Sequence, residues 1–76
     1  MSSLKKLSQL ENSKSASIVS VNCNEAMRSR LSSLGFYPGA AVTAIFNSIS
    51  GEPRAYHIQG SIIALRSCDA EKIIIK

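Results

Sequence analysis

The chain lacks the long hydrophobic runs of a membrane-spanning helix, and its first residues lack the apolar core of a secretory signal peptide. It is also poor in cysteine: Cys23 and Cys68 are its only two, 45 positions apart, which is too few for a disulfide scaffold. We expect both cysteines to be reduced thiols. These absences predict a cytoplasmic protein that does not insert directly into a membrane.

The sequence also has little of what an enzyme active site needs. Its four glycines are isolated from one another, so there is no phosphate-binding loop of the G-x-x-x-x-G-K type. The five carboxylates form no pair with acid–base spacing, and serine is so frequent that a serine–histidine–aspartate combination carries no information. We therefore expect no catalytic residues and no enzymatic activity.

The positive charge is mild and dispersed. Nine basic residues against five acidic ones give a net charge of +4; the lysines lie mainly near the two ends, and the arginines form no run. A nucleic-acid-binding domain of this size usually has a dense basic stripe with aromatic residues between the charges. The charge pattern therefore argues against nucleic acid. It favours solubility or attraction to an acidic partner or membrane surface.

Potential metal ligands are present but badly spaced. His57, Cys68, Asp69, Cys23 and Glu71 could all coordinate a metal, yet no two of them have the spacing of a ligand pair. We expect no metal site and no cofactor. The histidine should be exposed in a strand, and the two cysteines should be small buried hydrophobic residues. An alternative is a small metal-responsive or ligand-sensing module, marked by coordination through His57 with Cys68 or Asp69.

Short β-branched stretches between turn-forming residues predict one mainly β domain over residues 1–76. So many short strands with tight connections suggest a small barrel or a strongly curled sheet. The predicted strands at 62–66 and 72–75, both rich in isoleucine, should supply much of the core. The expected elements are a helical turn carrying Leu4, Leu7 and Leu10, strands at 15–21, 41–46, 54–59, 62–66 and 72–75, a helix at 25–34, a loop at 47–53 and a short helical turn at 68–71.

The helix is the best-determined element. Asn24 is a natural N-cap, because its side-chain oxygen can accept a hydrogen bond from a free amide in the first turn. Met27, Leu31 and Leu34 follow at spacings that place them on one face. Gly35 should end the helix in the left-handed conformation.

Two aromatic residues follow this glycine. Phe36 and Tyr37 stand between Gly35 and the Pro38-Gly39 turn, where the chain changes direction. We expect Phe36 to be buried and Tyr37 to be exposed, since a tyrosine hydroxyl tolerates a wet surface. A rigid corner that carries aromatic residues is either ordinary packing or a docking surface, and both interpretations stay open.

The segment 30–40, R-L-S-S-L-G-F-Y-P-G-A, resembles the R-L-x-x-L-G-[FLM]-x-P-G-x signature of FeoA proteins. The resemblance covers about residues 7–75. It departs from the family at Ser61-Ile62, where a tyrosine often precedes the strand, and in the loop at 47–50. Further matches keep the family's order: Ser8–Leu10 with the Ile18–Val19 strand, Glu52–Ile58 against G-[DE]-P-[ILV], Ile62–Arg66 against Y-x-[IL]-A-L-R, and Asp69–Ile73 against E-A-x-x-I.

The resemblance implies an SH3-like β-barrel with a short helical insertion, as in the C-terminal domain of iron-dependent repressors. It implies a non-enzymatic cytoplasmic accessory protein that binds the ferrous-iron transporter FeoB and lies at the inner membrane only through that partner. Self-association is a further option. The expected contact residues are Leu34, Gly35, Phe36, Tyr37, Pro38, Gly39 and Ala40, with Arg28 and Arg30 assisting orientation.

Overall fold

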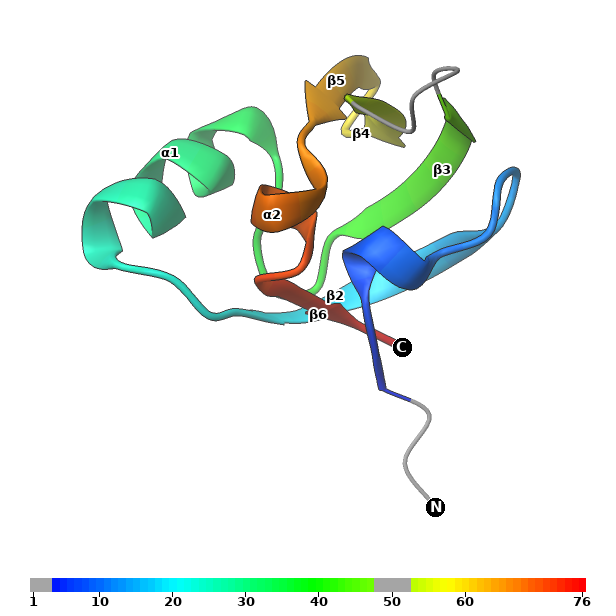
Figure 1. Ribbon diagram of the computed structural model, residues 1–76. Coiled ribbons are helices and arrows are strands. Elements are labelled where there is room, and N and C mark those ends of the chain that lie inside the picture. Colours follow the sequence, from blue (N-terminus) through cyan, green and yellow to red (C-terminus); the bar gives the residue numbers. More distant parts are fainter. Residues whose placement is uncertain (1–3, 48–52) are drawn as a thin grey trace.

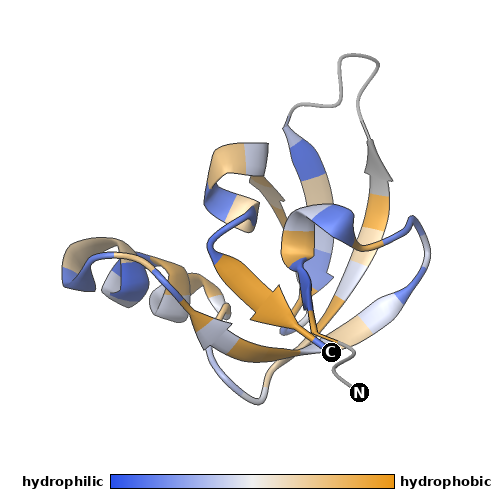
Figure 2. Cartoon of the chain, turned by 60° about the horizontal axis from the view of Figure 1, so that its bottom comes forward, coloured by the Kyte–Doolittle hydropathy of each residue, from blue (hydrophilic) through white to orange (hydrophobic). Residues whose placement is uncertain are grey.

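The computed structural model describes residues 4–47 and 53–76, and Figure 1 shows their arrangement. In both Figure 1 and Figure 2, α1 lies to one side of the strands. The elements are β1 (Lys5–Lys6), η1 (Leu7–Gln9), β2 (Ser15–Val21), α1 (Glu25–Leu34), β3 (Ala41–Asn47), β4 (Arg54–Ile58), β5 (Ser61–Leu65), α2 (Ser67–Ala70) and β6 (Ile73–Ile75).

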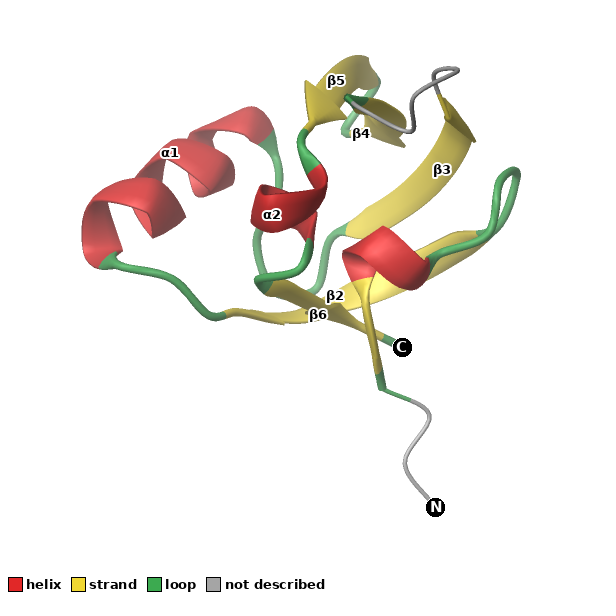
Figure 3. Ribbon diagram, viewed as in Figure 1, coloured by secondary structure: helices red, strands yellow, loops and turns green. Residues whose placement is uncertain are grey.

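All pairings between strands are antiparallel, in the order β1-β6-β2-β3-β4-β5. The first half of β2, Ser15–Ser17, pairs with β3, and the second half, Ile18–Val21, pairs with β6. Register shifts in β2 and β3 bend the sheet, as bulges do. Figure 3 shows the resulting curl. The prediction of a mainly β fold with a helical insertion is confirmed, although no ladder among the described residues joins β1 to β5 to close a barrel.

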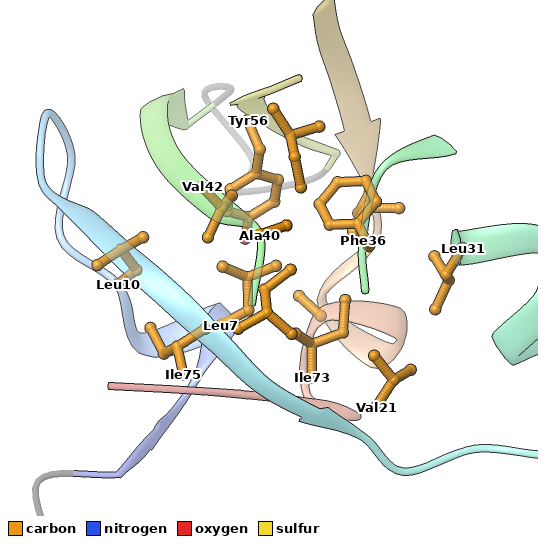
Figure 4. Packing of buried hydrophobic residues seen from close by; sticks show 14 of the residues in the cluster. Leu7, Leu10, Val21, Leu31, Phe36, Ala40, Val42, Tyr56, Ile73 and Ile75 are labelled. Atoms are coloured by element: carbon orange, nitrogen blue, oxygen red, sulfur yellow. The ribbon is translucent and has the colours of Figure 1, made fainter. Parts of the chain in front are cut away.

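The core lies inside the curl of the sheet. Figure 2 shows β6 as an unbroken hydrophobic strand, and in Figure 4 the rings of Phe36 and Tyr56 meet at one end of the core. Removing this apolar surface from water is the main force that holds so small a domain together. The buried hydrophobic residues are Leu7, Leu10, Ile18, Val21, Leu31, Phe36, Ala40, Val42, Ala44, Tyr56, Ile58, Leu65, Ala70, Ile73 and Ile75.

The expectation that the predicted strand at 62–66 fills the core is wrong for most of that strand. In β5, Leu65 is buried and Ile63 is half-buried, but Ile62 is 67% exposed. Ile62 pairs with His57 of β4, which is also exposed, so both side chains lie on the face of the sheet that points away from the core. The last strand, β6, does contribute Ile73 and Ile75 as expected.

The N-terminal segment is only partly as predicted. A short 3₁₀ turn buries Leu7, and Leu10 packs in the same core, but Leu4 is 51% exposed and a two-residue strand precedes the turn. The loop expected at 47–53 falls mainly outside the described residues, while Asn47 belongs to β3. The other predicted strands, the helix and the short helical turn before β6 are confirmed within a residue or two.

Candidate interaction surface at the helix–strand corner

The helix–strand corner is residues 34–40, and it starts at the last residue of α1. Local capping fixes both ends of this helix. The Asn24 side-chain oxygen accepts a hydrogen bond of 2.8 Å from the Met27 amide, which confirms the predicted N-cap. Glu25 in the first turn complements the positive end of the helix dipole. Leu31 is fully buried, so this one residue ties the helix firmly to the core.

The helix ends in a Schellman motif. Gly35 takes the left-handed conformation with a φ of 110°, and its amide donates to the Ser32 carbonyl at 3.0 Å. The Phe36 amide donates to the Leu31 carbonyl at 2.8 Å, and both of these side chains are buried in the core. This is the hydrogen-bond pattern, with its apolar contact, that commonly terminates helices. The direction in which the chain leaves α1 is therefore fixed.

Alanine at Gly35 should lower the free energy of unfolding by roughly 2–3 kcal/mol. The positive φ disfavours any side chain, and an added Cβ would lie 3.0 Å from Gln59 Cγ. Gly60→Ala is the matched control, because Gly60 has a φ of 78° but no atom within 4 Å of an added Cβ. The control should lower the free energy of unfolding by only about 1 kcal/mol, as measured by urea denaturation. Equal costs for the two variants would show that Gln59 does not resist the new methyl group.

A tight turn then returns the chain to the sheet. The Ala40 amide donates to the Tyr37 carbonyl at 3.0 Å, with Pro38 second and Gly39 third in the turn at a φ of 94°. These residue types in this order are typical of a type II turn. The backbone of β2 holds the turn, because Gly39 donates to the Ile18 carbonyl at 2.8 Å and Ile18 donates to the Ala40 carbonyl at 2.9 Å.

The two aromatic residues of the corner have opposite roles, as predicted. Phe36 is fully buried and meets Tyr56 edge to face, with 6.4 Å between the ring centroids and 90° between the planes. Tyr37 is 39% exposed. Gly35 and Ala40 are buried as well, so these two residues, like Phe36, are not offered to a partner. The outward part of the corner consists of Leu34 and Tyr37–Gly39.

The predicted contact residues do not form one patch, because they lie on two sides of α1. A hollow of about 480 Å³, here called the Tyr37 groove, is lined by Val21, Glu25, Arg28, Ser29, Ser32, Phe36, Tyr37 and Pro38. A smaller hollow of about 280 Å³, the Leu34 groove, is lined by Met27, Arg30, Leu31, Leu34, Pro53, Ala64, Leu65, Arg66 and Asp69. Arg28 and Arg30 are separated by about 200° of rotation around the helix. The structure thus brings Arg28 beside Tyr37 and places Arg30 beside Leu34.

The Tyr37 groove combines an apolar wall with one charge of each sign. The guanidinium of Arg28 donates to the Cys23 carbonyl at 3.2 Å, which orients this side chain along the start of the helix. Glu25 lines the same groove. An aromatic ring and an arginine are residue types that contribute strongly to protein interfaces. The groove can therefore receive an apolar side chain and pair with charges at its rim.

The potential metal ligands are dispersed. His57 is exposed on β4, as predicted, and Cys23 is half-buried against the core. The prediction that Cys68 is a buried hydrophobic residue is wrong, because it is exposed at the start of α2, 4.0 Å from an oxygen of Asp69. Within residues 4–47 and 53–76, no three His, Cys, Asp or Glu side chains gather as a metal site would require.

Sequence reasoning missed Arg54. This arginine, at the start of β4, is only 8% exposed and lies over the Tyr56 ring at 5.5 Å from its centroid. The available signal was the residue type, since the position corresponds to an aliphatic residue in the G-[DE]-P-[ILV] pattern. An arginine there departs from that pattern and introduces a charge at an inward-facing position.

Burial raises the pKa of Tyr56 above its ordinary value of 10.0, while the neighbouring Arg54 charge and a hydrogen bond from it act in the opposite direction. The phenol therefore holds its proton more tightly in the folded chain than in the unfolded one. This contribution to stability is fully present below about pH 10 and is lost as the pH rises further. Urea denaturation between about pH 9 and pH 11 should show a fall in stability that is shallower in Tyr56→Phe. An equally steep fall in that variant would contradict the assignment.

Comparison with known proteins shows the family to which the chain belongs. The model of the FeoA domain family matches residues 5–76, almost the whole chain. The chain belongs to the FeoA family. This family is linked to ferrous iron transport and is an accessory domain rather than a known enzyme family. A comparison with curated protein sequences gives no significant match.

Solved FeoA structures share both fold and sequence with this FeoA chain. The Chlorobium tepidum FeoA protein is 31% identical with a TM-score of 0.87, and the match covers 93% of this chain and 68% of that one. Stenotrophomonas maltophilia FeoA, solved with zinc and described as an SH3 domain protein and a candidate activating factor of ferrous iron transport, is 30% identical. That match has a TM-score of 0.83 and covers 95% of this chain and 89% of the other. The SH3-like fold predicted from the sequence is confirmed.

Two further groups extend the likeness. Iron(II) transport protein A from Clostridium thermocellum is 26% identical with a TM-score of 0.90, over 95% of this FeoA chain and 44% of that one. A manganese-dependent transcriptional repressor shares the fold alone, at 12% identity and a TM-score of 0.85, and this chain spans 42% of it. Among residues 4–47 and 53–76, no helix has the length and hydrophobicity needed to cross a membrane.

Proposed function

We propose that this FeoA protein is a non-enzymatic accessory factor of ferrous iron uptake that binds the cytosolic or membrane-proximal part of a FeoB-type transporter. The proposal is supported by membership of the family and by relatives described as iron(II) transport protein A and as a candidate transport-activating factor. In this role the chain is cytoplasmic and reaches the inner membrane only through its partner. The described residues offer no grouped ligands for the metal-responsive alternative.

The observation that carries this proposal is an exposed aromatic residue on a rigid support. Tyr37 lies between a capped helix end and a turn that hydrogen bonds hold to β2. A side chain on a fixed backbone loses little conformational entropy when it binds, so more of its contact energy appears as affinity. Tyrosine is also among the residues that most often dominate an interface. We therefore place the centre of the contact at Tyr37.

Charge supports the choice of partner surface. The chain carries a net charge of +4, and Arg28 lines the groove beside Tyr37. A basic protein associates faster with an acidic surface, and this acceleration weakens as salt screens the charges. The contacted region of the transporter should accordingly be acidic at its rim and apolar at its centre.

The direct test is binding to the transporter reconstituted in lipid nanodiscs, with the chain immobilised and empty nanodiscs as the control. Saturable binding that an excess of free chain competes away supports the proposal. A response no larger than that of empty nanodiscs, at transporter concentrations of tens of micromolar, would overturn it. Sedimentation of the chain alone over a range of concentrations tests self-association, which stays a separate prediction.

A further inference from the structure

Arg54 is a buried cation whose charge is not balanced by the side chains described around it. It is 8% exposed, and its acceptors are neutral: the Ser8 carbonyl at 3.3 Å from Nη1, the Asn12 side-chain oxygen at 2.9 Å from Nη2, and the Tyr56 hydroxyl, which also accepts from the guanidinium. Within the part of the chain that the structure describes, no carboxylate forms an ion pair with this guanidinium. Burying a charge without a counter-charge is costly.

One donor of the same guanidinium is also unused. Arg54 Nε is buried and has no hydrogen-bond partner. A guanidinium has five N–H groups in a planar fork, and pairs of them match the two oxygens of a carboxylate or phosphate. Native proteins rarely leave a buried charged donor unsatisfied, so the guanidinium is incompletely satisfied in the free chain.

The guanidinium is accessible to such an acceptor. Arg54, Tyr56, Ser8, Asn12 and Glu11 line a hollow of about 500 Å³, the Arg54 pocket, which lies within the range of small-molecule sites. The Tyr56 ring lies 5.5 Å from the guanidinium carbon and helps to hold the fork in one orientation. Glu11 is the one feature that opposes an anion, because its carboxylate shares the lining.

We propose that the Arg54 pocket binds a small oxyanion, a carboxylate or a phosphate, with the Arg54 guanidinium as its principal ligand. The anion supplies the missing counter-charge to the part of the guanidinium that faces the pocket. It binds weakly, with half-saturation near a millimolar, because one guanidinium provides most of the attraction and Glu11 reduces it. The pocket is distinct from the Tyr37 groove, and this proposal does not depend on transporter binding.

The test follows the arginine Nε–H signals of the isotope-labelled chain by NMR during titration with sodium phosphate, sodium acetate and, as the ionic-strength control, sodium chloride. The chain has only four arginines, so each signal can be assigned by substitution. We expect the Arg54 Nε–H signal to shift saturably with phosphate, acetate or both, and the better of the two identifies the source of the oxyanion. If both anions act no more strongly than chloride, the site holds at most water or an adventitious ion only, and the proposal is overturned.

Two variants make the result specific. Arg54→Lys keeps the positive charge but loses the planar fork and should weaken binding at least about tenfold, read from the backbone amides around the pocket. Glu11→Gln changes an exposed side chain, so it should fold normally and strengthen anion binding a few-fold by removing the opposing charge. Unchanged affinity in Glu11→Gln would place the anion outside this pocket and contradict the proposal, even if Arg54→Lys failed to fold.

Discussion

Alanine at Phe36 should lower the free energy of unfolding by about 3–5 kcal/mol, the largest loss of stability expected from a single substitution in this chain. The ring is fully buried, contacts Tyr56 edge to face, and directly follows the glycine that ends α1. A domain of this size has a total stability of only roughly 4–11 kcal/mol. The variant should therefore lie close to unfolding, as measured by urea denaturation at 25 °C.

Phe36→Leu is the matched control for this prediction. Leucine keeps most of the buried apolar volume and loses the aromatic contact with Tyr56, so it should cost only about 1–2 kcal/mol. A cost below about 1 kcal/mol for Phe36→Ala would mean that the ring does not support the core, since buried aromatic residues do not have so small an effect. The claim that Phe36 holds the corner rigidly to the core would then be wrong.

Alanine at Tyr37 should weaken binding to the FeoB-type transporter by about thirtyfold, or about 2 kcal/mol, as truncation of an interface anchor typically does. The stability of the isolated chain should change by less than about 1 kcal/mol, because the side chain is 39% exposed and the turn is held by backbone hydrogen bonds. Nanodisc binding and urea denaturation of the same preparation check both parts.

Leu34→Ala is the matched control on the other side of α1. Leu34 is 37% exposed, almost the same as Tyr37, but it lines the Leu34 groove. Its truncation should change affinity less than about threefold if the contact is centred on the Tyr37 groove. A large loss with Leu34→Ala and none with Tyr37→Ala would move the interface to the Leu34 groove. Of the corresponding charge variants, Arg28→Gln should weaken binding to the transporter, and Arg30→Gln should leave the affinity nearly unchanged.

The parts of the fold that local chemistry determines could be predicted from the sequence. The start of α1 depends on a side chain at Asn24 and an amide three residues later, and its end depends on Gly35, which alone tolerates the required φ. Capping and turn formation need no knowledge of distant residues. The burial of Phe36 and the exposure of Tyr37 could also be predicted, from the different chemistry of the two rings.

Features that depend on strands far apart in the sequence could not be predicted in this way. The exposure of Ile62 follows from its register opposite the exposed His57, which the residues of β5 do not reveal. The burial of Arg54 requires acceptors at Ser8 and Asn12, more than forty positions away in sequence. By contrast, the separation of Arg28 from Arg30 follows from helical geometry alone and was available from the sequence.

The central claim is that the outward face of the helix–strand corner binds the transporter, and an amide-resolved NMR titration tests it most directly. The isotope-labelled chain is titrated with the cytosolic portion of its FeoB-type transporter, and every backbone amide is followed at once. The account predicts saturable shifts gathered at Arg28, Ser32, Tyr37 and Gly39, around the Tyr37 groove. Shifts confined to β5 or to the Arg54 pocket, or no shifts at saturating partner concentration, would contradict it.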